Sequence, residues 1–259
     1  MQLRSISLSL LIILNILFAN TATAQVTKNL RTVNLTNSNN DFSNPNLVIK
    51  KMTVKEISND ELAKLKSVQY NHVSDFQIPY EMKANRNELN NILAVVDKLI
   101  ALGEKIIPLI EKGKAVYRSK NMEAISVIPN LGSSVNSLAE IANWSYPVTK
   151  HFKVVFENLY GIDVVSFVYS VTFQYNGSYG GKGKYLTGVR VATRDVSVMW
   201  GFDVDAHSEL IQISNVGTTS NVVAGATIEI NYTVGNVLNV ISTSEAFHVT
   251  GDGKIFRLD

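Results

Sequence analysis

The fold is decided by the stretch from Asp163 to Ala206, which reads DVVSFVYSVTFQYN, then GSYGGKGK, then YLTGVRVATRDVSVMWGFDVDA. In its first part the large apolar side chains take every second position, at Val165, Phe167, Tyr169, Val171, Phe173 and Tyr175. A period of two, rich in β-branched and aromatic residues, predicts a strand with one buried face. The glycine-rich segment 177–183 predicts the turn at which the chain reverses.

The same alternation continues to the end of the chain. One face of the next strand carries Val196, Val198, Trp200, Phe202 and Val204, so we expect Trp200 in the core. A further alternation runs from Ile228 to Val234, and turn signals separate these segments. Strands without helical crossovers predict an antiparallel β-sandwich of about seven to nine strands over residues 148–259.

The preceding region, residues 47–147, has a different pattern. Between Asn87 and Ile107 apolar residues recur at three- and four-residue spacing, at Leu89, Ile92, Leu93, Val96, Leu99, Ile100, Ile106 and Ile107. This spacing predicts one long amphipathic helix, extending to about residue 112, with its apolar side packed on the sandwich. The expected fold class is therefore mostly β with an α-helical N-terminal part.

The N-terminus has the features of a secretory signal peptide over residues 1–24. Arg4 precedes an apolar run at 8–19, and Ala22, Thr23 and Ala24 supply small residues before a cleavage point. The alternative is a membrane anchor, but the run is shorter than the roughly 20 residues that a spanning helix needs. We therefore expect cleavage after Ala24 and a periplasmic or secreted location. The Asn-rich segment 25–46 is poor in bulky apolar groups and predicts a mobile arm.

Composition excludes some classes of function. The chain has 24 Lys and Arg against 22 Asp and Glu, so its net charge of +2 does not favour a nucleic-acid partner. It has no cysteine, which excludes disulfides and thiol nucleophiles. It also lacks G-x-S-x-G and H-E-x-x-H, and we expect no cofactor. These features favour a non-catalytic protein.

A metal site is one hypothesis for the strand after residue 202. Asp203, Asp205 and His207 lie at alternate positions, so on a strand all three point to the same side. Carboxylate and imidazole groups together suit a divalent cation such as zinc or manganese. The alternative is a solvated strand face whose acidic groups discourage edge pairing.

Ligand binding is a second hypothesis, at two places. Trp144 and Tyr146 lie at a corner before Pro147, where exposed rings could stack on a sugar; the alternative is a corner packed onto the sandwich. In the glycine-rich loop, Tyr179, Lys182 and Lys184 offer a ring and two cations. Tyr185 follows Lys184, so the loop does not match a P-loop, and a plain hairpin is its alternative interpretation.

The sequence predicts an exported bacterial protein with a binding or structural role, whose partner is another cell-envelope protein or a carbohydrate. A first alternative is a membrane-active, pore-forming-like protein that uses the 87–112 helix on a membrane surface. A second alternative is a metal-dependent binder or enzyme that uses Asp203, Asp205 and His207.

Overall fold

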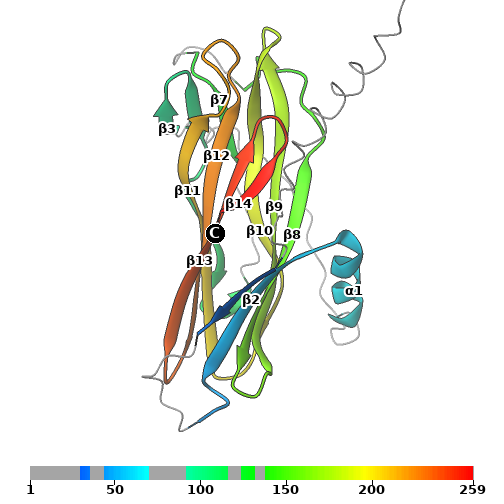
Figure 1. Cartoon of the computed structure of the whole chain (residues 1–259), viewed down its shortest axis with the longest axis vertical. Helices are drawn as coiled ribbons and strands as arrows, with labels where there is room; N and C mark the ends of the chain where they lie inside the picture. The colour runs from blue at the N-terminus through cyan, green and yellow to red at the C-terminus, as the bar shows by residue number, and fades with distance from the viewer. Residues whose placement is uncertain (1–29, 36–43, 70–91, 116–123, 132–137, 259) are drawn as a thin grey trace, which may run out of the picture.

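The structure is a computed structural model that describes residues 30–35, 44–69, 92–115, 124–131 and 138–258. The predicted signal peptide and parts of the predicted arm lie outside these residues. The described chain is mostly β, with two antiparallel sheets and one short helix, and the sheets form an elongated, sandwich-like body (Figure 1).

The larger sheet has eight strands in the order β1-β2-β8-β9-β10-β7-β4-β3. Their bounds are Leu30–Asn34 for β1, Ile49–Ile57 for β2, Val148–Asn158 for β8, Asp163–Tyr179 for β9, Lys182–Val198 for β10, Ile125–Pro129 for β7, Leu99–Leu102 for β4 and Ile92–Val96 for β3. The strands β9 and β10 are the longest and lie in the middle, as the alternation in the sequence predicts.

The smaller sheet has six strands in the order β14-β13-β12-β11-β5-β6. Their bounds are Ile255–Leu258 for β14, Val240–Thr250 for β13, Ala224–Asn236 for β12, Phe202–Asn215 for β11, Ile106–Glu111 for β5 and Lys114–Ala115 for β6. Strands that precede residue 148 thus belong to both sheets, because β5 pairs with β11 while β2 pairs with β8.

The core lies between the two sheets and is rich in aromatic rings. Phe152 of β8 lies 4.8 Å from Phe247 of β13 between ring centroids, and Phe167 of β9 lies 5.4 Å from Tyr232 of β12. Phe173 is also fully buried, so the predicted inward face of β9 is confirmed. Side chains at alternate positions of both sheets therefore form one interior.

The helix α1, at Asn59–Gln69, covers part of the outer face of the larger sheet (Figure 1). Its Leu62 packs against Val168 of β9, which is why this outward position of β9 is buried. The ring of His151 on β8 adds a polar contact, since its Nε2 lies 3.0 Å from Asn59 Oδ1 and its Nδ1 lies 2.7 Å from Ser170 Oγ.

The prediction of a long amphipathic helix over 87–112 is wrong for residues 92–111, which form β3, β4 and β5. Asp97 has a φ of 48° in the turn between β3 and β4, and Gly103 has a φ of 137° after β4. These left-handed positions break the segment into short strands. Leu99 and Ile100 are buried on opposite sides of β4. A strand that is buried on both sides has consecutive apolar residues, and their spacing cannot be told apart from that of a buried helix.

The predicted mobile arm also needs correction where the structure describes it. Leu30–Asn34 forms β1, which pairs antiparallel with β2 in a continuous register. Arg31 on this strand contacts Glu245 of β13, in the other sheet. Part of the arm is therefore an edge strand that links the two sheets.

Candidate functional site

Three hairpin loops meet at one end of the molecule. The β8–β9 loop spans residues 159–162, the β10–β11 loop spans 199–201 and the β12–β13 loop spans 237–239. The strand pairings place them side by side, because Val165 of β9 pairs with Val198 of β10 and Phe202 of β11 pairs with Asn236 of β12. All three turns lie at the lower end of the body in Figure 1.

These loops and the first residue of β13 carry an unusual set of exposed apolar side chains, which we call the apolar tip: Tyr160, Ile162, Met199, Trp200, Val237, Leu238 and Val240. They are seven of the sixteen large hydrophobic side chains that are exposed among the described residues. Trp200 is 93% exposed and Val237 is 86% exposed. Single exposed apolar residues are ordinary, but a cluster of this kind marks an interaction surface.

The exposure of Trp200 contradicts its predicted place in the core. Strand β10 ends at Val198, and residues 199–201 form a turn in which the Phe202 amide donates to the Met199 carbonyl at 3.1 Å. Gly201 supplies the left-handed φ of 89° that this turn requires. The alternation of the strand therefore stops before Trp200, whose ring points into solvent.

The β8–β9 loop is held in shape by one asparagine. The Asn158 side-chain oxygen accepts hydrogen bonds from the amides of Tyr160 and Ile162, both at 3.0 Å. Its side-chain amide donates to the Asn46 carbonyl at 3.2 Å, and Asn158 itself is buried. This asparagine therefore fixes the loop that presents two of the apolar side chains.

The β12–β13 loop is built in the same way. The Asn236 side-chain oxygen accepts from the amides of Leu238 at 2.8 Å and Asn239 at 3.0 Å. Its side-chain amide donates to the Leu47 carbonyl at 2.6 Å. The segment before β2 thus connects both loops, and the tip is a preorganised surface.

The tip is uncharged, and charged side chains begin directly behind it. Residues 158–162, 199–201 and 236–240 contain no Asp, Glu, Lys or Arg. Within two positions of these ranges lie the exposed carboxylates of Asp163 and Asp203 and the ion pair of Lys51 and Glu157, whose charged atoms are 2.9 Å apart. The surface therefore changes sharply from apolar to charged along the long axis of the molecule.

The structure separates the two aromatic residues of the predicted corner. Trp144 packs over Gly177 of β9, where a Cβ atom would lie 2.4 Å from the indole ring, so this ring belongs to the packed body. Tyr146 is 94% exposed and points into solvent. The two rings thus face different surroundings, and the corner does not present them as a pair.

The other predicted ligand residues lie at the end opposite the tip. Tyr179 and Lys182 pair across the Gly180–Gly181 turn, whose φ values are 55° and 74°, so the predicted hairpin turn is confirmed. Lys184 is part of β10, and its amide donates to the Val222 carbonyl at 2.8 Å. Binding of a ligand here stays a prediction.

Asp203, Asp205 and His207 lie on β11 as predicted. His207 Nδ1 and Asp205 Oδ1 are 4.0 Å apart and both side chains are substantially exposed. In the described part of the chain no three His, Asp or Glu side chains are grouped so that they could hold a metal ion. Metal binding by these three residues therefore stays a prediction without a preformed cluster behind it.

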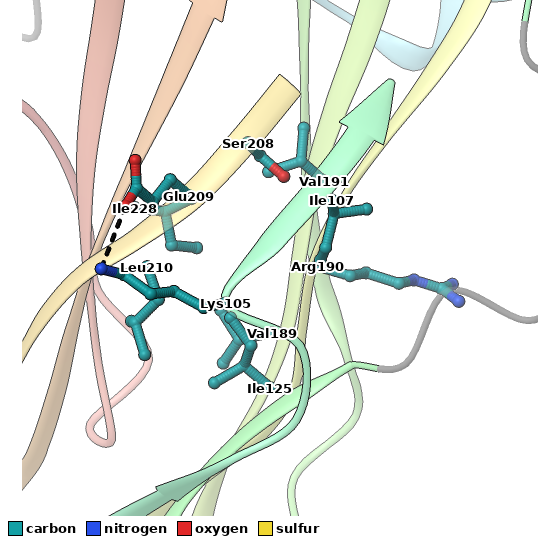
Figure 2. Close-up of a pocket in the computed structure, with 10 residues that line it drawn as sticks. All are labelled: Lys105, Ile107, Ile125, Val189, Arg190, Val191, Ser208, Glu209, Leu210 and Ile228. Carbon is teal, nitrogen blue, oxygen red and sulfur yellow. Dashed lines mark ion pairs between the residues drawn. The ribbon is translucent and has the colours of Figure 1, made fainter. Parts of the chain in front are cut away.

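The pocket drawn in Figure 2 lies between β5, β7, β10 and β11 and does not offer a ligand site. Lys105 and Glu209 form an ion pair of 3.1 Å at its edge, and Arg190 points away from it. Aliphatic side chains such as Ile107 and Val189 fill its interior, which leaves no room for a water molecule.

A second group of polar and ionisable side chains lies buried between the sheets. Glu245 of β13 is almost completely buried and contacts Arg31 and Arg257. Its Oε2 lies 2.7 Å from Arg257 Nε. Burial raises the pKa of Tyr169 and of Tyr232, so both hydroxyls stay neutral. Glu245 and both tyrosines are enclosed in the core, so we assign the cluster a structural role.

Sequence reasoning missed the apolar tip. Its members lie in or beside turns, where alternation along strands gives no information on exposure. The available signal was the occurrence of large apolar residues within turn sequences, in NLYGID at 158–163 and NVLNV at 236–240. Gly, Pro, Asn, Asp and Ser dominate turns, so large apolar residues in these turns were the feature to notice.

Comparison with known protein families, with curated proteins and with solved structures gives no match for this chain. No helix in the described ranges is both long and apolar enough to cross a membrane. Inference about function therefore depends on the geometry of the apolar tip.

Proposed function

We propose that this is an exported, non-catalytic binding protein, which holds its partner at the apolar tip of two packed β-sheets. One observation carries the proposal: seven large apolar side chains are exposed on three adjacent loops and the first residue of β13, and Trp200 is the most exposed of the seven at 93%. Tryptophan and tyrosine are enriched among the residues that dominate binding energy.

The energetics favour a surface that is covered when the protein works. Removing apolar surface from water contributes about 25 cal/mol per Å², and an exposed indole keeps this contribution available for binding. The asparagines at positions 158 and 236 hold the loops before any partner arrives. A fixed surface loses little conformational entropy on binding, which raises affinity.

Export is part of the proposal and has its own measurement. We expect the mature protein, recovered from the periplasm or the culture medium, to begin at Gln25 because the residues at 22–24 match a cleavage site. Intact-mass spectrometry reads this directly. A protein that retains Met1 in a membrane fraction would contradict export with cleavage.

The two alternatives drawn from the sequence have less support. The pore-forming alternative depended on a helix at 87–112, and residues 92–111 of it are strands. The metal-dependent alternative depended on Asp203, Asp205 and His207, of which the structure brings only the last two into contact range. Neither alternative explains why apolar side chains gather at the tip.

The test compares retention on the cell envelope. We expect Trp200→Ser combined with Val237→Ser to release the protein from washed envelopes of its host, because both side chains are exposed and the fold does not need them. Tyr146→Ser is the matched control, since Tyr146 is an aromatic residue of equal exposure that lies outside the tip. Equal retention of all three proteins, with unchanged circular dichroism, would contradict binding through the tip.

A further inference from the structure

We infer that the partner of the apolar tip is the interfacial region of a lipid bilayer, into which the three loops dip while the sheets stay in water. This inference rests on the proposed function and names the class of partner. Three features of the tip support a lipid surface: its polarity profile, its satisfied backbone and its shape.

The polarity profile matches the step from water to lipid. The outermost loops carry only apolar residues, glycine and asparagine, and the first charged side chains lie within two positions of them. Trp200 and Tyr160 each combine an apolar ring with one polar group, and such rings favour the level of the lipid headgroups. The charged residues Asp163 and Asp203 would then stop insertion at a shallow depth.

In two of the three loops most backbone amides are hydrogen-bonded within the protein. Backbone groups that enter lipid must have their hydrogen bonds satisfied internally. In the β8–β9 loop the amides of residues 159–162 all donate within the protein: two to the Asn158 side chain and two to backbone carbonyls. In the β12–β13 loop the amides of residues 238–240 donate to the side chains of Asn236 and Asn239. These amides would therefore not lose hydrogen bonds on leaving water.

This end of the described chain is formed by hairpin turns. Figure 1 shows three separate turns that project at the lower end of an elongated body. Projecting turns suit a deformable lipid layer, whereas a protein partner would need a groove that accepts three turns together. With the long axis of the body near the membrane normal, all three loops reach the interface at once.

The charges on and near the loops predict which lipid headgroups the protein needs for binding. The loops themselves are uncharged, and the exposed groups nearest to them carry both signs: Asp163 and Asp203 are acidic, and Lys50, which follows the partner of Asn158 in β2, is basic, so the tip has no excess of positive charge. Attraction to anionic lipid needs basic residues close to the surface. Binding should therefore occur on zwitterionic phosphatidylcholine vesicles, and it should change little in about 1 M salt, where the Debye length is about 3 Å.

The experiment uses the two tryptophans of the chain as separate reporters on the exported protein. In Trp144→Phe the only indole is Trp200, and we expect its emission to shift to shorter wavelength when phosphatidylcholine vesicles are added. In Trp200→Phe the only indole is Trp144, which packs on Gly177, and its emission should not respond. Circular dichroism of both variants checks that the fold is kept.

Co-sedimentation with the same vesicles measures how strongly the protein binds to them. Replacing Trp200 and Val237 by serine should raise the dissociation constant for the vesicles by about tenfold or more, since both large apolar side chains that would enter the lipid are removed. Tyr146→Ser should bind as the unaltered protein does. An unchanged Trp200 spectrum, or binding that requires anionic lipid and disappears in salt, would overturn the lipid inference.

The two proposals fail in different ways. If the double serine variant leaves the cell envelope but the unaltered protein ignores vesicles, the tip binds a protein or glycan, and only the lipid inference is wrong. If neither envelope retention nor vesicle binding depends on the tip, both proposals are wrong.

Discussion

Two aromatic residues show how the position of a side chain decides its contribution to the stability of the fold. Phe173 is fully buried between the sheets, whereas Trp200 is almost fully exposed. We expect Phe173→Ala to lower the free energy of unfolding by about 3–5 kcal/mol, because it removes a buried ring and leaves a cavity. Trp200→Ala should change it by less than about 0.5 kcal/mol, as is usual for surface positions. Urea denaturation of both variants measures the contrast, and similar losses would show that Trp200 also supports the core.

At Gly177 the absence of a side chain is itself a packing requirement. A Cβ atom there would meet the ring of Trp144 at 2.4 Å, so one of the two must move. Gly177→Ala should destabilise the protein by about 1–3 kcal/mol, within the range for overpacking.

Gly235 provides the control for this substitution. It also lies in a strand, but a Cβ atom there would make only an ordinary contact, 3.5 Å from Val240. Gly235→Ala should therefore be close to neutral or slightly stabilising. If both glycine variants melt at the same denaturant concentration, packing of Trp144 does not explain Gly177.

The alternation of apolar and polar residues predicted the buried face of β9, because in a strand that is buried on one side every second side chain points into the core. It could not predict the exposure of Trp200, since the period says nothing about where a strand ends. Gly201, which allows the left-handed turn, was the local hint. The apolar tip became visible only when three loops, separated by up to eighty residues, were placed together.

At the scale of elements, the segment 92–111 shows where sequence reasoning failed. Leu99, Ile100 and Ala101 are consecutive and buried, because β4 has neighbours on both of its faces. A strand buried on both sides loses its period of two, and its apolar residues then also match the spacing of a helix. The pairing with β7 and β3, which is a tertiary effect, decided the outcome.

The helix α1 was predictable because its start is encoded locally. The Glu61 amide donates to Ser58 Oγ at 3.1 Å, and the Ser58 amide donates to Glu61 Oε2 at 2.8 Å, which is a capping box. Ser58→Ala should therefore destabilise the helix by about 1 kcal/mol. Hydrogen exchange at the first turn of α1 measures the effect, and unaltered protection would contradict a role for the cap.

The same box predicts a dependence on pH. The Lys55 ammonium and the Ser58 amide, by hydrogen bonding to Glu61, hold the pKa of its carboxyl at about 2, below the ordinary value of 4.5. A lowered pKa stabilises the fold above pH 4.5, and this contribution is lost as the pH falls from 4.5 to about 2. Thermal melts of the unaltered protein and Glu61→Gln should therefore converge across this range. A difference in melting temperature that is constant with pH would contradict this assignment.

At the scale of the whole molecule, the two sheets are joined by hydrogen bonds at both ends. At the end opposite the tip, the amide of Asn176 in the larger sheet donates to the Gly251 carbonyl at 2.9 Å, and the amide of Gly251 donates to Ala224 in the smaller sheet at 2.7 Å. Gly251 has no room for a Cβ atom, which would lie 2.1 Å from the Lys184 carbonyl oxygen. At the tip, Asn236 of the smaller sheet reaches Leu47, next to β2 of the larger one.

Between these ends, ion pairs connect the two sheets along one long edge of the molecule. Arg31 of β1 and Arg257 of β14 both contact the buried carboxylate of Glu245. Glu245→Met removes the carboxylate that both guanidinium groups contact, and breaking a buried ion pair in this way typically costs about 3–5 kcal/mol. Arg31→Met keeps the contact of Glu245 with Arg257, so its loss should be smaller, about 1.5–3 kcal/mol, the range for hydrogen bonds to charged groups.

Hydrogen exchange distinguishes a local from a global role for this contact. Arg31→Met should increase exchange mainly in β1 and the paired residues of β2, because β1 is an edge strand whose link to the other sheet is lost. Glu245→Met should increase exchange in both sheets. Lys51→Met is the control, since its ion pair with Glu157 is partly exposed and worth at most about 1 kcal/mol. If Arg31→Met behaves like this control, β1 is held by its backbone pairing with β2 alone, and the edge of the molecule is joined without the ion pair.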